Sequence, residues 1–189
     1  MEIRTLTTPP LIEGRRVTGY AARFNSPSEV LAERGKVFRE VILPGAFTRS
    51  LTAPPRRDIL ALWQHGQDGR PPLGRTPDTL RLWEDSEGLA FSLDLPDSAD
   101  DVREAVARRD VRGMSFGFDP RAEDKWSIRN GVQMREVVDA PLFEVSLVIR
   151  PAYTATSVQL RDTSRVVVPE LPPSLLNRAR RLLELADRA

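Results

Sequence analysis

The chain has 189 residues, with no cysteine, one histidine, and 28 Lys and Arg against 27 Asp and Glu, for a net charge of +1. Without cysteine it can form no disulfide framework, Cys-based zinc site, iron–sulfur cluster or thiol nucleophile, and one histidine cannot supply a His-rich metal site. The near-zero net charge argues against a surface that is dominated by phosphate binding, so no nucleic-acid partner is expected.

The length and hydropathy of the chain predict one globular core with an appendage. No stretch approaches the ~20 apolar residues that a helix needs to cross a bilayer, so no membrane partner is expected. The first residues, Met1-Glu2-Ile3-Arg4, lack the basic flank and apolar run of a signal peptide. We therefore expect a cytoplasmic protein.

Strand patterns dominate the first two thirds of the chain. Leu89, Phe91, Leu93 and Leu95 alternate with polar or small residues, which is the period of a sheet with one buried face. The predicted strands cover residues 17–24, 59–63, 79–83, 89–95, 112–118, 132–138 and 142–149. About seven strands are enough to close a small barrel, so we expect an α+β fold: a small closed β-barrel with flanking helices.

Helical patterns are fewer. Ser98, with Asp101 three residues later, resembles a capping box and predicts a short amphipathic helix over residues 98–109, and a weaker pattern covers residues 44–51. Near the C-terminus, three prolines mark a linker over residues 162–173, and an apolar stripe predicts an amphipathic helix over residues 174–189. The main domain is expected to cover residues 1–161.

His65 lies in Leu62-Trp63-Gln64-His65-Gly66, at the end of the predicted apolar strand. A Gly- and Pro-rich loop follows it and runs to Gly74. A side chain at a strand end, beside a loop that is free to vary, is well placed to reach a functional site. The alternative is a histidine that only caps the strand by hydrogen bonding.

Ser115 lies in Gly113-Met114-Ser115-Phe116-Gly117-Phe118. The glycines allow another group to approach the backbone closely, and the apolar neighbours exclude water, as a nucleophile site requires. A plain strand with Ser115 facing solvent fits equally well. The segment leads into Asp119-Pro120 rather than into a helix, so it does not support the nucleophile elbow of the α/β-hydrolases.

Glu144 falls inside the most apolar stretch of the chain, residues 142–149. Its carboxylate is either on the exposed face of an alternating strand or buried and paired, because an unpaired buried charge is costly. Pairing with His65 would hold the imidazole in one tautomer and stabilise its charged form. Asp139 is a less attractive candidate for the same partner.

Five blocks of the sequence together carry a resemblance to a known family. They are residues 19–25, Phe38-Arg39-Glu40 to Pro44-Gly45-Ala46-Phe47, Trp63-Gln64-His65, residues 113–118, and Glu144-Val145-Ser146-Leu147-Val148 with Pro151-Ala152-Tyr153. In this order and spacing they resemble the prohead maturation proteases of tailed bacteriophages of the HK97 type, over roughly residues 15–161. These proteases are serine endopeptidases.

The resemblance implies a barrel surrounded by helices, like that of the herpesvirus assembly proteases, and a site without a cofactor. It implies that His65 is the general base, Ser115 the nucleophile and Glu144 the orienting acid. Because the chain has one histidine, a second histidine in the third position, as in the herpesvirus enzymes, is impossible. Candidates for the oxyanion hole are backbone N–H groups near Ser115 or a group from the loop that holds Arg150.

The resemblance also implies the partners. The expected substrates are capsid-assembly proteins, chiefly a scaffolding segment of the major capsid protein precursor, and the protease itself. The expected place is the host cytoplasm, inside the assembling procapsid of a phage or prophage. The C-terminal helix would pack on the barrel, form a homodimer, or dock the enzyme inside the procapsid and be removed by self-cleavage in residues 161–173.

Two rival functions stay open at this stage. One is a catalytically inactive capsid-assembly or scaffolding factor with the same fold, against which the intact set of His65, Ser115 and Glu144 argues. The other is a β-barrel nucleic-acid module in which Trp63 and Trp83 stack on bases. The net charge of +1 argues against the second.

Overall fold

The computed structural model describes residues 1–33, 35–52, 58–119 and 124–149. All of them belong to the unit Met1–Ser157. The predicted linker 162–173 and the predicted helix 174–189 lie outside the described residues, so both stay predictions. Among the described residues, no helix is long and apolar enough to cross a membrane.

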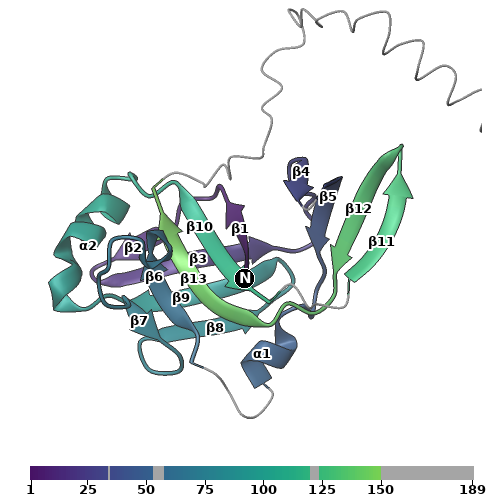
Figure 1. Cartoon of the computed structure of the whole chain (residues 1–189). Helices are drawn as coiled ribbons and strands as arrows, with labels where there is room; N and C mark the ends of the chain where they lie inside the picture. Colours follow the sequence, from purple (N-terminus) through teal and green to yellow (C-terminus); the bar gives the residue numbers. More distant parts are fainter. Residues whose placement is uncertain (34, 53–57, 120–123, 150–189) are drawn as a thin grey trace, which may run out of the picture. The chain divides into compact units, whose positions relative to one another are not determined.

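The described residues form a mostly β structure with three sheets and two short α-helices (Figure 1). The first sheet has the order β1 (Glu2–Leu6), β10 (Gly113–Phe118), β13 (Leu142–Val148), β6 (Leu60–Trp63) and β7 (Gly74–Arg75). The second has the order β2 (Leu11–Glu13), β3 (Arg16–Arg23), β9 (Gly88–Asp94) and β8 (Leu80–Glu84). The third has the order β11 (Asp124–Arg129), β12 (Val132–Val137), β5 (Lys36–Ile42) and β4 (Leu31–Glu33).

The hydrophobic core lies between the first and second sheets, because both turn alternate apolar residues toward it. From β10 it takes Met114, Phe116 and Phe118, and from β9 it takes Leu89, Phe91 and Leu93. The helix α2 (Asp100–Ala107) contacts β2, and α1 (Thr48–Thr52) contacts β8 (Figure 1). The face of β10 that points away from this core is therefore available for other chemistry.

The predicted hairpin 79–95 is confirmed as β8 and β9, which pair antiparallel from Glu84↔Leu89 to Leu80↔Leu93. The predicted helix 98–109 is confirmed in its centre, where Val102 and Val106 are buried. Its start differs from the prediction. A 3-10 turn (Asp97–Ala99) precedes the α-helix, and no side chain caps it, so the Ser98 capping box does not form.

The expected closed barrel of about seven strands is not found in the described residues, where thirteen strands form three open sheets. The second and third sheets meet through a single isolated bridge, Phe24↔Ile42, rather than a continuous ladder. The two sheets do not join because β5 pairs with β12 instead, in parallel, from Phe38↔Gln133 to Ile42↔Val137. Periodicity along one segment predicts a strand but does not predict which other strand it pairs with.

Candidate active site

His65 reaches the first sheet through a reversal of the chain at the end of β6. The strands β6 and β13 run parallel with Glu144 opposite Leu60, so His65 must fold back to reach Glu144. Gln64 and His65 both have positive φ angles, 47° and 59°, in the 3-10 turn Gln64–Gly66. The imidazole Nδ1 then lies 2.8 Å from Oε1 of Glu144. The histidine is therefore bonded to a carboxylate of the next strand.

The Glu144 carboxylate is buried and has a partner on each oxygen. The side chains of His65 and Glu144 are 8% and 5% exposed. Ser146 donates its hydroxyl to Oε2 of Glu144 at 2.5 Å. Gly117 lies opposite Glu144 on β10, and a Cβ atom there would lie 2.8 Å from Oε1. Glu144 is therefore buried and paired, and it does not lie on an exposed face of the strand.

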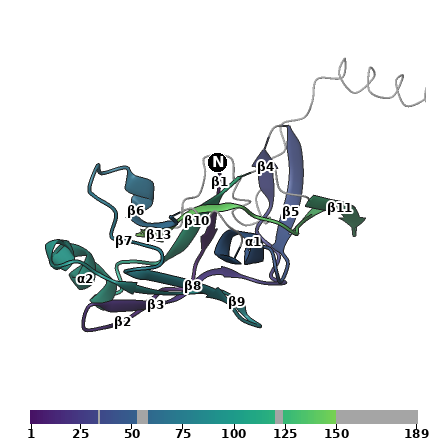
Figure 2. The same ribbon diagram turned by 90° about the horizontal axis from the view of Figure 1, so that it is seen from below.

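Ser115 lies on the same face of the first sheet as Glu144. It is opposite Ser146 across β10 and β13, and Gly117 is opposite Glu144 in the same register. These two strands run side by side in both views (Figures 1 and 2). Ser115 is fully buried, so the alternative of a serine facing solvent is wrong.

The N-terminal strand β1 supplies the partners of the Ser115 hydroxyl. Ser115 Oγ donates to the carbonyl oxygen of Arg4 at 2.8 Å and accepts from the hydroxyl of Thr5 at 3.2 Å. Nε2 of His65 is buried and has no hydrogen-bond partner among the described residues. His65 and Glu144 are therefore brought together, whereas Ser115 shares their sheet face without a bond to the imidazole.

A buried ionic cluster fixes β1 against the third sheet. Arg4 donates to both oxygens of Glu40, at 2.6 and 3.0 Å, and to Glu33 at 3.1 Å. Arg135 donates to Glu40 at 2.9 Å and to Asp124 at 2.6 Å. Burial would lower the pKa of Arg4, but the surrounding carboxylates raise it above the ordinary arginine value, so Arg4 stays charged. The carbonyl that holds Ser115 is thus on a firmly anchored strand.

A family model described as Caudovirus prohead serine protease matches residues 4–168. The chain belongs to this serine protease family. Comparison with curated proteins and with solved structures finds no match. The family match spans His65, Ser115 and Glu144, and it begins inside β1, so it includes Arg4 and Thr5 as well.

Two further predictions about this prohead protease concern its site. Asp139, the weaker candidate for the acid, is bonded to Arg49. Arg150, a candidate for the oxyanion hole, lies outside the described residues. Backbone N–H groups near Ser115 are the other candidates, but β10 is a central strand between β1 and β13, so its amides alternate between two ladders. A backbone N–H of β10 could serve in the oxyanion hole only if its hydrogen bond to β1 or β13 were broken.

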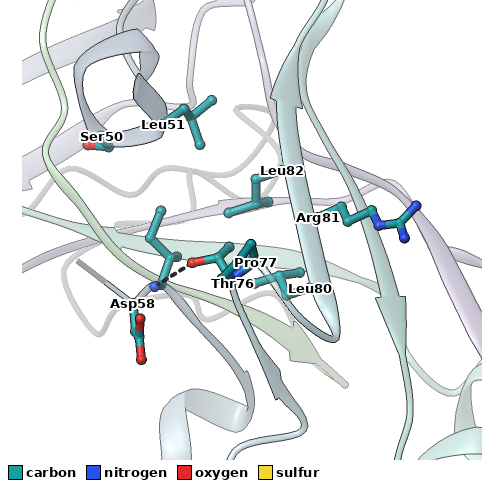
Figure 3. A pocket seen from close by; sticks show the side chains of 9 residues that line it. Ser50, Leu51, Asp58, Thr76, Pro77, Leu80, Arg81 and Leu82 are labelled. Atoms are coloured by element: carbon teal, nitrogen blue, oxygen red, sulfur yellow. Dashed lines mark hydrogen bonds between the residues drawn. The ribbon is translucent and has the colours of Figure 1, made fainter. Parts of the chain in front are cut away.

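The prohead protease also has a pocket of about 210 Å³ between α1, the start of β6 and β8 (Figure 3). Its lining residues are Ser50, Leu51, Asp58, Ile59, Thr76, Pro77, Leu80, Arg81 and Leu82. The backbone N–H of Ile59 donates to the Thr76 hydroxyl at 3.0 Å, and Arg81 points away from the hollow (Figure 3). The pocket shares no residue with the candidate active site.

Sequence reasoning missed three contributors to this site: Arg4, Thr5 and Ser146. Arg4 and Thr5 belong to a strand that was not predicted, because Glu2 to Leu6 lacks an apolar alternation. Ser146 lies two residues from Glu144 on the predicted strand 142–149, but no role was predicted for it. A signal was present, since a hydroxyl two residues from a buried carboxylate on one strand must share its face.

Proposed function

We propose that this family member is a serine endopeptidase in which Ser115 is the nucleophile, His65 the general base and Glu144 the acid that orients it. The observation that carries the proposal is the 2.8 Å contact of Glu144 with Nδ1 of His65. This contact leaves the buried Nε2 as the imidazole atom that can exchange a proton. Ser115 projects from the same sheet face, one strand away from Glu144.

The residues act in sequence by acyl transfer. His65 Nε2 takes the proton of Ser115 Oγ while Oγ attacks the scissile carbonyl carbon, and the C=O electrons move to the oxygen. His65 then gives the proton to the leaving amine as the C–N bond breaks. Water then attacks the acyl-enzyme while His65 takes its proton, and His65 returns this proton to Ser115 Oγ as the ester bond breaks. The Glu144 carboxylate stabilises the imidazolium that forms.

This mechanism requires a rearrangement of the described conformation, in which Ser115 is fully buried. Ser115 Oγ must exchange its bond with the Arg4 carbonyl for a bond with Nε2 of His65. Catalytic hydrogen bonds commonly tighten only when substrate is bound. Entry of a peptide beside β10 and β1 is the event that would drive the exchange.

The substrates follow from the family. Members are prohead proteases, which implies a role in capsid maturation. We propose that the chain cuts the scaffolding segment of the major capsid protein precursor, and itself, inside the assembling procapsid of the host cell. No cofactor takes part in the proposed steps. An inactive assembly factor with the same fold is the alternative, but the buried His65–Glu144 pair favours a working base.

Co-expression with the capsid precursor of the same phage genome tests the proposal. We expect the wild-type chain to process the precursor, and Ser115→Ala and His65→Ala to fold but leave it intact. Ser127→Ala is the matched control, because Ser127 is an exposed serine on β11. Undiminished processing by Ser115→Ala or His65→Ala would show that the assignment is wrong.

A further inference from the structure

We propose that Ser146 is a positioning residue that holds the Glu144 carboxylate toward His65, an inference that rests on the proposed function. Glu144 has two oxygens and two partners. Oε1 contacts Nδ1 of His65 at 2.8 Å, and Oε2 accepts the Ser146 hydroxyl at 2.5 Å. Ser146 thus determines where the second oxygen lies, and through it the direction in which the first one points.

Burial makes this second partner necessary. Glu144 and Ser146 are both buried, so water cannot replace a lost hydroxyl. A carboxylate oxygen that is buried without a donor is costly, and a glutamate has several rotatable bonds through which it can turn away. Without the Ser146 hydroxyl, Glu144 would therefore swing toward another donor and loosen its contact with His65.

The placement of Ser146 follows from the strand itself. Residues two apart on β13 share a face, so Ser146 and Glu144 project together, while Val145 and Leu147 point to the hydrophobic core. Ser146 is also the register partner of Ser115. It therefore lies between the proposed nucleophile and the proposed acid, and its own hydroxyl hydrogen is directed at Glu144 rather than at the base.

Two variants and one control test the inference. Ser146→Ala removes the hydroxyl, Ser146→Cys keeps a similar volume with a weaker donor, and Ser127→Ala is the exposed control. The probe is a fluorophosphonate that modifies active serines, for which the maximal labelling rate and the half-saturating concentration are measured separately. Because the chain has one histidine, a spectrum of ¹⁵N-histidine protein reports His65 alone.

We expect Ser146→Ala to lower the maximal labelling rate about tenfold with little change in the half-saturating concentration, since a hydrogen bond to a charged group is lost. We expect its Nδ1–H signal to broaden through faster exchange with water. Ser146→Cys should fall between Ser146→Ala and the wild type. A residue that only filled space would leave the imidazole signal of a folded Ser146→Ala protein unchanged.

An unchanged labelling rate and an unchanged Nδ1–H signal in folded Ser146→Ala would overturn the inference. So would a phosphonyl adduct on Ser146 in the wild type, because that would make Ser146 the nucleophile. Failure of the proposed function is distinguishable from both results. A wild type that is neither labelled nor active would refute the proposed active site, and the spectra would still show whether Ser146 orients the Glu144–His65 pair.

Discussion

Glu144 and His65 lie 79 residues apart in the chain and meet through a contact of 2.8 Å between Oε1 and Nδ1. Both side chains are almost completely buried, at 5% and 8% exposure. A histidine held in this way has one fixed tautomer and presents Nε2 in a fixed direction. The rest of the site depends on whether the Glu144 carboxylate stays in place.

Removing the charge of Glu144 should disable the site without unfolding the protein. We expect Glu144→Gln to lower the rate of fluorophosphonate labelling by about a hundredfold or more, because an amide no longer fixes the tautomer or stabilises the imidazolium. Asp139→Asn is the control, since Asp139 bonds to Arg49. Equal labelling rates in the two variants would contradict this role of Glu144.

Gly117 should be intolerant of even one added methyl group. A Cβ atom at this position would lie 2.8 Å from Oε1 of Glu144 and 2.7 Å from the sulfur of Met1. The displaced carboxylate would then lose its alignment with His65, so we expect Gly117→Ala to reduce the labelling rate about tenfold. A parallel thermal unfolding curve checks that the variant is folded. A folded Gly117→Ala protein with wild-type labelling would show that the Glu144 carboxylate can accommodate the methyl group without losing its alignment with His65.

The ionic cluster on β1 should contribute to stability far more than an exposed ion pair. Arg4→Ala leaves Glu40 buried with part of its charge unpaired, and we expect a loss of about 3 kcal/mol in the free energy of unfolding, measured with urea. Arg16→Ala, which breaks an exposed pair with Asp94, is the control and should have little effect. Equal losses in the two variants would contradict the structural role of the cluster.

If the protease cleaves itself, we expect the cut to lie in the C-terminal part of the chain. We expect the mass spectrum of purified protein to contain an N-terminal fragment that ends between residues 161 and 173, in the predicted linker. The fragment should be absent from Ser115→Ala prepared in the same way. A fragment of the same mass in Ser115→Ala would assign the cut to a host protease.

Local patterns predicted the two strands that carry Ser115 and Glu144, within one or two residues. The strands 112–118 and 142–149 correspond to β10 and β13. The apolar neighbours of Glu144 left two environments open, exposed or buried and paired. The partner that decides between them comes from another strand and a positive-φ turn, which no local pattern encodes.

The remaining features depend on long-range pairing and could not be predicted from local patterns. Charged residues such as Arg4, Glu40 and Arg135 suggest an exposed surface, and they become buried because each finds opposite charges from other strands. The closed barrel was inferred from the number of predicted strands and from the family resemblance. Parallel pairing of β5 with β12 instead leaves three open sheets in the described residues.

The identity of the nucleophile is tested most directly by locating a covalent adduct. The wild-type chain is treated with a fluorophosphonate, digested and mapped by mass spectrometry, beside His65→Ala. We expect one adduct, on the peptide that contains Ser115, and a labelling rate in His65→Ala that is lower by several orders of magnitude. An adduct on a different serine, or equal labelling of His65→Ala, would contradict the proposed active site.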